Sequence, residues 1–487
     1  MVATERRKWL ALGLLSAVQF MVVLDIAIVN VALPSIKVDL GFSQENLQWV
    51  ISAYALVFGG FLLLGGRAAD LLGRRRIFLV GLVIFTIASF LAGMAWSEGS
   101  LIGARALQGL GAAIISPAAL SILSVTFREG RERNIALGVW GAVGGFGAAA
   151  GVLLGGILTD ALSWEWIFFV NVPVGVAAFV IAPFLLTESR DARVSSFDVP
   201  GAVLVTAGLS SVVYAITKAG TDGWLAGPTL AFFAASVLLL AAFVAWEVRH
   251  AEPLMRFGIF RISTVTGANV AGFILGTAMF AMFLMLTLYM QQVLGYSAMK
   301  TGIAYLAVAG TAIIWSAVAA QLTTRLGMKP VLVAGMTTLT IGLVYFTQVS
   351  VGGSYLADLL PGFLLIGFGL GFSFVPISIA ALAGVQPAEA GLASGLINTS
   401  QQIGGALGIA ALSTIASSRT EDAVATGTAL PSALVDGFTA AFVAGAIIAA
   451  VGILASLTLI RRRELEQMPA VEPAVEPAPE PAFDAVA

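Results

Sequence analysis

Two charged side chains that lie deep within long apolar runs, Asp25 and Arg105, raise the question of what chemistry this chain performs. An ionised carboxylate in hydrocarbon costs at least roughly 2.5–3.5 kcal/mol, so Asp25 must pair, take up a proton or face water. Each of these makes its protonation state easy to change, which is what a proton carrier requires. The alternative interpretation is that Asp25 only forms structural hydrogen bonds.

The two side chains are expected to meet. They lie on apolar runs that cross in opposite directions, and Asp25 lies about 12 Å and Arg105 about 6 Å below the same membrane face. Because an arginine side chain covers that difference, the spacing predicts an Asp25–Arg105 interaction, direct or through water. Protonation of Asp25 would release Arg105 to Gln108 or to a carbonyl. The alternative is that Arg105 only braces its own surroundings.

The composition places these residues in a membrane protein. Of 487 residues, 59% are hydrophobic and 11% are charged, and the mean hydropathy is +0.97. Soluble domains contain about 25% charged residues, so a soluble enzyme is excluded. The chain has no cysteine and one histidine, and no lysine follows a glycine, so we expect no metal site, no cofactor and no phosphate-binding loop. A net charge of -2 indicates no nucleic-acid partner.

The elements that must position Asp25 and Arg105 are membrane-spanning helices. A span needs about 20 mostly apolar residues, and backbone hydrogen bonding in lipid favours helix for such runs. The first run is too long for a signal peptide and is expected to be retained. The sequence predicts fourteen spans, near 10–33, 46–66, 77–96, 101–124, 135–158, 164–186, 199–219, 226–246, 264–290, 300–321, 329–349, 355–382, 391–416 and 438–460.

The basic residues predict the orientation, because cytoplasmic connections are enriched in lysine and arginine. With the N-terminus inside, 20 of the 25 basic residues lie in inner segments and one, Arg105, lies inside a span. The other four are in outer segments: Lys37, Lys218, Lys300 and Arg419. We therefore expect a multi-pass protein of the cell membrane with both termini in the cytoplasm.

Similar fragments indicate an internal repeat. Gly109-Leu-Gly111 before Pro117 resembles Gly369-Leu-Gly371 before Pro376, and Gly73 after the second span resembles Gly327 after the tenth. This pairs spans 1–6 with spans 9–14, places Leu365 opposite Arg105 and Thr324 opposite Asp70, and leaves spans 7 and 8 as an insertion. The expected domains are a six-helix bundle at 1–186, the insertion at 187–250, a second six-helix bundle at 251–463 and a disordered acidic, proline-rich tail at 464–487.

Five ordered motifs carry a resemblance to a known family. They are Asp25…Asn30…Pro34, Gly66…Asp70…Gly73-Arg-Arg-Arg76, Arg105-Ala-Leu-Gln108-Gly109, Gly147…Gly151…Gly155-Gly156 and Trp164-Glu-Trp166…Asn171-Val-Pro173. Together they resemble the major facilitator superfamily, in particular its fourteen-span drug:proton antiporter branch. Two positions depart from the family pattern: Val152 stands where proline is usual, and Glu165 where arginine is usual.

Two of these motifs predict moving or closely packed parts. The connection formed by Gly66, Asp70, Gly73, Arg74 and Arg75 is expected to act as a conformational latch, with Asp70 accepting from a helix N-terminus or a nearby arginine. The alternative is that these arginines only anchor the topology. On the fifth span, a small-residue face is expected to pack against the second half and to take part in gating, or else to serve ordinary packing: Gly144, Gly147, Gly151 and Gly155.

A substrate cavity has weaker candidates. Flexible sulfurs, aromatic rings and amides suit a promiscuous apolar site, although lipid contact or plain packing explains them equally well. The candidates are Gln108, Met282, Met285, Tyr289, Gln292, Asn398 and Gln402, with Gln401 beside the last.

The resemblance and Asp25 together predict a proton-coupled antiporter that exports amphipathic or apolar small molecules by alternating access. Its energy source would be the proton gradient, its partners a small-molecule substrate and the lipid bilayer, and its functional unit a monomer. Export of one specific metabolite, uptake by symport or uniport, and a non-transporting sensor are the alternatives.

The orientation yields the first prediction. Because the chain lacks cysteine, a Thr420→Cys variant carries a single thiol in the 417–437 connection. An impermeant maleimide added outside intact cells should label it. Labelling only after the inner face is exposed would overturn the orientation.

Overall fold

The computed structural model describes residues 2–127, 131–189, 198–250, 253–254, 257–385 and 390–460; the predicted tail at 464–487 lies outside them. The described residues form helices and loops, without a strand. The long helices are α1 (Val2–Leu40), α3 (Trp49–Leu72), α4 (Arg74–Gly93), α5 (Glu98–Thr126), α6 (Arg131–Ala161), α8 (Asn171–Leu185), α9 (Val199–Asp222), α10 (Gly227–Arg249), α11 (Ser263–Leu288), α12 (Ala298–Leu326), α13 (Met328–Tyr345), α14 (Leu360–Leu382), α15 (Ala390–Ala425) and α16 (Leu430–Leu459). Short helices are α2 (Gln44–Leu47), α7 (Trp166–Phe169), and 3₁₀ or π turns at Phe257–Arg261, Tyr289–Val293, Phe346–Gln348 and Tyr355–Leu359.

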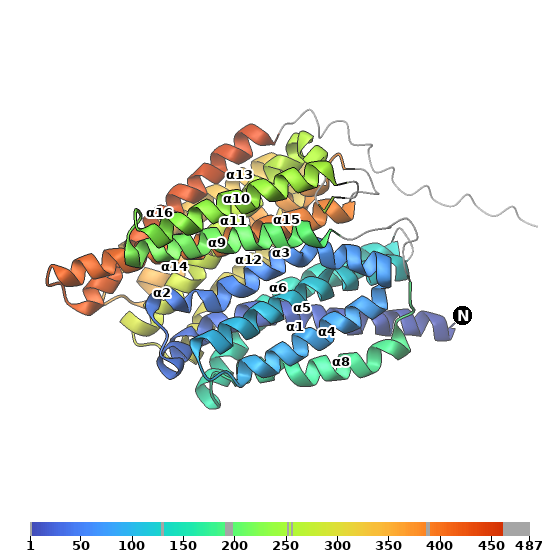
Figure 1. The fold of residues 1–487 in the computed structure, drawn as a ribbon, viewed down its shortest axis with the longest axis horizontal. Helices are drawn as coiled ribbons and strands as arrows, with labels where there is room; N and C mark the ends of the chain where they lie inside the picture. Colours follow the sequence, from blue (N-terminus) through green and yellow to red (C-terminus); the bar gives the residue numbers. More distant parts are fainter. Residues whose placement is uncertain are drawn as a thin grey trace, which may run out of the picture.

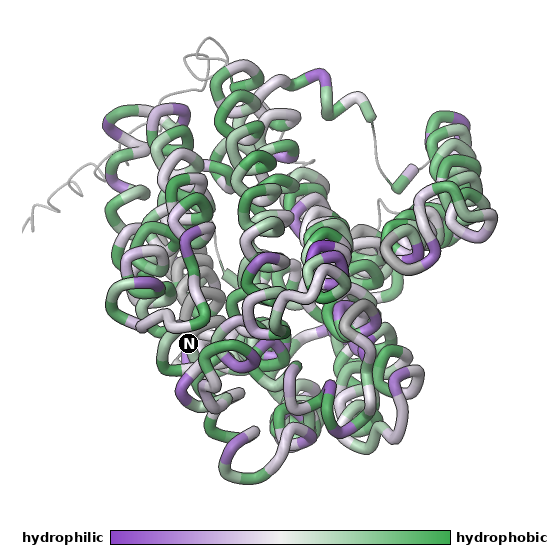
Figure 2. Tube along the Cα trace, turned by 90° about the vertical axis from the view of Figure 1, so that its left-hand side faces the viewer, coloured by the Kyte–Doolittle hydropathy of each residue, from purple (hydrophilic) through white to green (hydrophobic). Residues whose placement is uncertain are grey.

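The helices are long and apolar, as a membrane requires. Within the described residues, 11 helices are long and apolar enough to cross a bilayer, and shorter apolar stretches occur in α3 and α6. Hydrophobic residues occupy most of each helix in Figure 2, and hydrophilic residues are a scattered minority. The predicted all-helical architecture with many spans is therefore confirmed.

Some helices extend beyond the predicted spans. The first span was predicted at 10–33, and α1 runs from Val2 to Leu40. The connection predicted at 417–437 is mostly helical, because α15 continues to Ala425 and α16 begins at Leu430. A helix that has formed gains one hydrogen bond for each added residue, so it continues through polar positions beyond the apolar run.

Packing divides the long helices into two groups joined along two seams. The first group comprises α1, α3, α4, α5, α6 and α8, and the second comprises α11 to α16. The seams between them are formed by α6 with α12 and by α3 with α15. The hairpin of α9 and α10 lies outside both groups, and α9 packs on α3 and α15 (Figure 1).

The two ends of the bundle are packed differently. We call the end at which α1 begins and α16 ends the terminal end, and the opposite end, at which α5 and α12 begin, the far end (Figure 1). In its far half, the first group shares one hydrophobic core with the second group. In its terminal half, buried residues such as Leu15 and Phe78 belong to a cluster confined to the first group. The groups are thus joined by apolar packing mainly towards the far end.

Hydrogen bonds also cross between the groups. Gln291 Nε2 donates to the Val31 carbonyl over 2.8 Å, and the Met299 backbone N–H donates to Asp160 Oδ2 over 2.9 Å. Both contacts lie at the far end, whereas Thr399 Oγ1 of α15 donates to the Gly59 carbonyl of α3 over 3.1 Å nearer the middle of the bundle.

Helix α9 covers the α3–α15 seam. Gln48 Nε2 donates to Thr217 Oγ1 over 2.8 Å, which ties α3 to α9. Thr414 Oγ1 donates to the Ile216 carbonyl over 3.3 Å, which ties α15 to α9. Apolar residues from all three helices form a cluster of their own. The insertion therefore contacts both groups.

Close glycine contacts reveal the register of the internal repeat. A Cβ added at Gly109 would meet the Tyr54 carbonyl, and one at Gly367 would meet the Val308 carbonyl. Tyr54 and Val308 each precede the loop glycine of their group, Gly73 or Gly327, by the same 19 positions. Gly109 thus corresponds to Gly367.

The next glycine of each helix gives the same register. Gly111 packs on the Phe85 backbone, and Gly369 packs on the Leu339 backbone. The pairing of Gly109 with Gly369 was therefore wrong by two residues. Phe363, not Leu365, takes the place of Arg105. The glycine-leucine-glycine triplet misled because α14 has three glycines at intervals of two, Gly367, Gly369 and Gly371, so the pair in α5 matches it in two registers.

The glycine face of α6 packs within its own group, which corrects the prediction that it seals against the second half. Cβ atoms added at Gly151 and Gly155 would lie 2.7 Å from the carbonyls of Leu24 and Ile28, both in α1. Gly147 lies against Val23 in the same way, whereas the surroundings of Gly144 lie outside the described residues. The next residue, Gly156, is the one that meets Ala298 of the second group. Glycine here lets two backbones approach closely and holds α1 in place.

This packing predicts the effect of a bulky residue. Gly151→Leu should destabilise the protein by about 1–3 kcal/mol or more, because the side chain forces α6 away from α1. A lower melting temperature of the purified protein would report this. Gly310→Leu is the matched control, since an added Cβ there meets nothing within 4 Å. Equal melting temperatures of the two variants would contradict the assigned packing.

Candidate functional site

The structure brings Asp25 and Arg105 into direct contact inside the first group. Asp25 of α1 is 0% exposed, and Arg105 of α5 is 1% exposed. Arg105 NH1 lies 2.7 Å from Asp25 Oδ2. The two residues therefore form a fully buried ion pair between antiparallel helices.

Two side-chain amides complete the hydrogen bonds to the carboxylate. Gln108 Nε2 donates to Asp25 Oδ1 over 2.7 Å, and Asn171 Nδ2 donates to the same oxygen over 2.8 Å. With Arg105 on the other oxygen, Asp25 accepts three N–H bonds. A carboxylic acid needs an acceptor for its own proton, so this arrangement matches the ionised form.

Ser89 of α4 joins the same network. Its Oγ accepts from Gln108 Nε2 over 2.6 Å and from Asn171 Nδ2 over 3.3 Å. Ser89 and Asn171 are 0% and 2% exposed. The sequence analysis quoted Asn171 in a motif but assigned it no role, and it did not single out Ser89.

Arg105 is held from several sides. Its Nε donates to the Val50 carbonyl over 2.9 Å, and its NH1 also donates to Gln108 Oε1 over 2.6 Å. The guanidinium lies over the Tyr54 ring, 4.4 Å from the centroid. The spacing of three residues puts Arg105 and Gln108 on one face of α5, which is why both reach Asp25. Several partners would therefore retain Arg105 if Asp25 lost its charge.

The energy of such a site depends on its charge state. Removing two charges from water costs several kcal/mol per ion, and only close contact with full hydrogen bonding offsets that cost. Protonation of Asp25 would remove the negative charge and leave Arg105 to its other acceptors. The site can thus exist in two states that differ by one proton.

Glu188 contacts the segment that the sequence predicts to act as a latch. Glu188, which follows α8, accepts from the backbone N–H groups of Arg75 and Arg76 at the start of α4, at 3.1 and 3.2 Å. A carboxylate is favourable at this helix N-terminus. The side chain of Asp70 lies outside the described residues, Gly73 adopts a φ of 110°, and Arg74 begins α4. Gly66 lies beside Pro117 of α5. The sequence analysis missed Glu188 because it lies far along the chain.

The cavity candidates do not converge on one place. Met282, Met285 and Tyr289 are buried in the core that both groups share, and the Tyr289 hydroxyl donates to the Ser350 carbonyl over 2.7 Å. Gln292 is half-buried nearby in the chain, whereas Asn398 is exposed on α15. Gln402 is buried at the α3–α15 seam, where its Cβ faces Gly59, and Gln401 packs on Gly276. Gln108 belongs to the network around Asp25.

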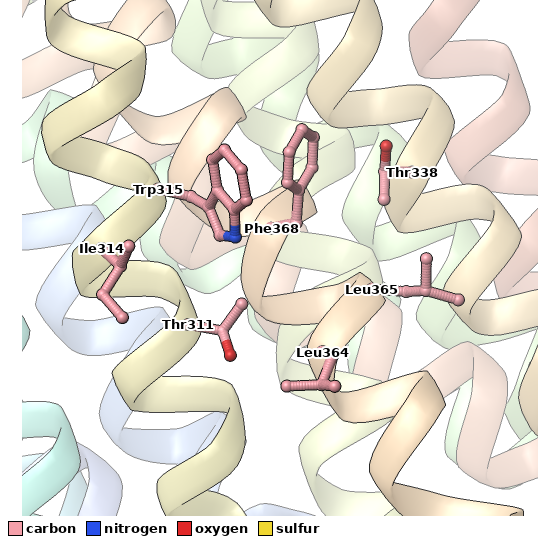
Figure 3. A pocket seen from close by; sticks show the side chains of 7 residues that line it. All are labelled: Thr311, Ile314, Trp315, Thr338, Leu364, Leu365 and Phe368. Carbon is pink, nitrogen blue, oxygen red and sulfur yellow. The ribbon is translucent and has the colours of Figure 1, made fainter.

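A groove of about 480 Å³ lies elsewhere, between α12, α13 and α14. Trp315 and Phe368 pack together in it with ring centroids 4.7 Å apart (Figure 3). The remaining lining residues are Thr311, Ile314, Thr338, Leu364 and Leu365. No lining residue is ionisable, and all belong to the second group, so the groove is separate from the ion pair.

Comparison with known proteins identifies the family. The family model of the Major Facilitator Superfamily matches residues 15–409. The chain belongs to the Major Facilitator Superfamily. It is a membrane transporter and not an enzyme. Within the described residues, no group of three or more His, Cys, Asp or Glu side chains could hold a metal ion.

Similar members of this superfamily are named for antibiotics. The chain is 41% identical to the puromycin resistance protein pur8 of Streptomyces alboniger, over 92% of this chain and 90% of that protein. It is 39% identical to the cephamycin export protein CmcT of Amycolatopsis lactamdurans, over 84% and 85% of the two chains. The relatives are thus resistance and export transporters.

Solved structures share the fold at low identity. A bacterial homologue of the human lysosomal transporter Spinster, in an inward-facing and unoccupied conformation, matches with a TM-score of 0.63 and 17% identity, over 93% of this chain and 98% of that one. A POT-family peptide transporter in complex with sulfate matches with a TM-score of 0.66 and 14% identity, over 92% and 94%. These likenesses concern the fold alone.

The buried pair yields a stability prediction. Arg105→Gln leaves a buried carboxylate without its cation, which costs roughly 3–5 kcal/mol. The melting temperature of the purified variant should fall sharply at pH 8 and recover as the pH is lowered, because protonation removes the unpaired charge. The double variant Asp25→Asn/Arg105→Gln should melt above Arg105→Gln at pH 8. A single variant that is as stable as the wild type at pH 8 would contradict the ion pair.

Proposed function

We propose that this transporter is a proton-coupled antiporter that exports amphipathic or apolar small molecules, antibiotics among them, from the cytoplasm by alternating access. The observation that carries the proposal is the buried network in which Asp25 accepts from Arg105, Gln108 and Asn171. The proton gradient is the energy source, and no cofactor takes part.

Proton and substrate are coupled because they favour different charge states of Asp25. With Asp25 ionised, Arg105 is held by the carboxylate and ties α1 to α5. Uptake of a proton releases Arg105 and loosens this tie. If substrate favours the ionised state, proton and substrate each weaken the binding of the other by the same factor, which is the requirement of antiport.

The proposed architecture has fourteen spans: six in each helix group and two in the α9–α10 insertion, with domain boundaries at 1–186, 187–250 and 251–463. The terminal end faces the cytoplasm of the cell, because most basic residues cluster in its connections. The contacts between groups at the far end then correspond to an inward-facing state. Rocking about the α3–α15 and α6–α12 seams would open the other face. The functional unit is a monomer.

The other candidate residues enter as separate proposals. Glu188 at the start of α4 supports a latch among Gly66, Asp70, Gly73, Arg74 and Arg75 that changes as the groups rock. The substrate contacts proposed are Gln108, Met282, Met285, Tyr289, Gln292, Asn398 and Gln402, several of which would become accessible only when the far end opens.

A narrower function has specific support. The puromycin, cephamycin and tetracenomycin C relatives are each named for one compound, whereas one relative is named a multidrug resistance protein. Export of one specific metabolite is therefore the second candidate. A panel that includes puromycin and a cephamycin distinguishes one transported compound from many.

The test is transport by the purified protein in lipid vesicles with an imposed pH gradient. Wild-type protein should move panel compounds against the proton flow, and reversing the gradient should reverse the movement. Asp25→Asn keeps the shape but removes the titrating group, so gradient-driven transport should fall to that of empty vesicles. Asp39→Asn is the matched control on the same helix, where the partner of the carboxylate among the described residues is Trp164 Nε1.

Two results would contradict the proposal. Compounds that move in the same direction as protons would indicate symport. Gradient-driven accumulation by Asp25→Asn would place the proton site elsewhere.

A further inference from the structure

The side-chain amides of Gln108 and Asn171 donate hydrogen bonds to the same two oxygen atoms. Gln108 Nε2 and Asn171 Nδ2 each donate one hydrogen to Asp25 Oδ1 and one to Ser89 Oγ, at distances between 2.6 and 3.3 Å. Each NH₂ group is therefore fully used, and together the two amides enclose the carboxylate oxygen. A proton that arrives at Oδ1 meets only donors, so one amide must give way.

The carbonyl ends of the two amides differ. Gln108 Oε1 accepts from Arg105 NH1 over 2.6 Å, so the Gln108 amide is fixed at both ends. In the part of the chain that the structure describes, the hydrogen bonds of the Asn171 side chain are the two that its NH₂ donates. Turning Asn171 thus breaks no bond to Arg105, whereas turning Gln108 breaks one.

We propose that Asn171 is a positioning residue for proton coupling, and that its amide turns when Asp25 takes up a proton. The proton forms an O–H bond at Asp25 Oδ1, and the N–H···O hydrogen bond from Asn171 breaks. Asn171 Oδ1 then accepts from the new O–H group. Arg105 loses its anionic partner and keeps Gln108 and Val50. This inference rests on the proposed role of Asp25.

The surroundings of Asp25 leave few other groups to explain a pH effect. Within the part of the chain that the structure describes, the charged and titratable side chains that face it are those of Arg105 on α5 and Tyr54 on α3. The neighbouring elements α4, α6 and α8 contribute uncharged groups: Ser89, Gly151 and Asn171.

The test is the pH profile of vesicle transport for an Asn171→Leu variant, which keeps the size of the side chain but neither donates nor accepts. Both protonation states lose a hydrogen bond, but the charge-assisted bond to the ionised carboxylate is about twice as strong as the neutral bond to the protonated form. The midpoint of the profile should therefore move to higher pH by up to about one unit, a tenfold change in proton affinity. Asn171→Ser should restore most of the wild-type midpoint, since a hydroxyl can donate to the ionised form and accept from the protonated form.

The matched control is Asn30→Leu. Like Asn171, Asn30 carries a buried amide, but it lies on α1 and donates to the carbonyls of Ile26 and Ala27 in its own helix. Its midpoint should equal that of the wild type. A purely structural role of Asn171 would lower the transport rate of Asn171→Leu at every pH and leave the midpoint unchanged, and that result would overturn the inference.

Infrared difference spectra of the purified protein on acidification give a readout without substrate. A protonated-carboxyl band absent from Asp25→Asn should appear in the wild type, together with a change in side-chain amide bands. In Asn171→Leu the carboxyl band should move to higher frequency, because its proton loses an acceptor.

The two failures are distinguishable. If wild type and Asp25→Asn give the same spectrum, Asp25 does not titrate and the proposed function fails. If the Asp25 band appears but is identical in Asn171→Leu, only the role of Asn171 is contradicted.

Discussion

The structure depends on one constraint: a carboxylate enclosed by apolar helices must have hydrogen-bond donors on both of its oxygens or must take up a proton. Asp25 meets this constraint with Arg105, Gln108 and Asn171, which bring together α1, α5 and α8. On another side of α1, Gly151 lets α6 pack closely against the helix that carries Asp25. The helix group that carries the acid is therefore organised around it.

The second helix group repeats the packing without the chemistry. In the register set by the glycine contacts, Phe363 takes the place of Arg105, and it packs against Tyr305 and Phe346 with centroids 5.4 and 5.7 Å away. An aromatic cluster replaces an ion pair at the same place in the fold. In the proposed mechanism the acid that takes up the proton therefore lies in the first group, and the second group has aromatic side chains at the same place.

The sequence predicted the parts of this account that depend on rare residues. A charge in an apolar run is costly and uncommon, so Asp25 and Arg105 were identified from their positions, and helix depth placed them within reach of each other. Asn171 and Ser89 were not recognised, because amides and hydroxyls are frequent in helices and only tertiary packing shows which of them reach the carboxylate. The partner of the α6 glycine face was wrong for the same reason: a small-residue face indicates a close neighbour but not which helix it is. The repeat register was wrong because the glycine pattern of α14 matches that of α5 in more than one register.

In the proposed antiporter, a proton on Asp25 and a bound substrate exclude each other. The most direct measurement is the pH change when a compound that the vesicle panel identifies as transported is added to the purified wild-type protein in weakly buffered solution near the midpoint of its pH profile. Binding should release protons from the wild type and release none from Asp25→Asn, although that variant still binds, because an amide resembles a protonated carboxyl. Equal proton release by an Asp25→Asn protein that binds the compound would contradict this coupling.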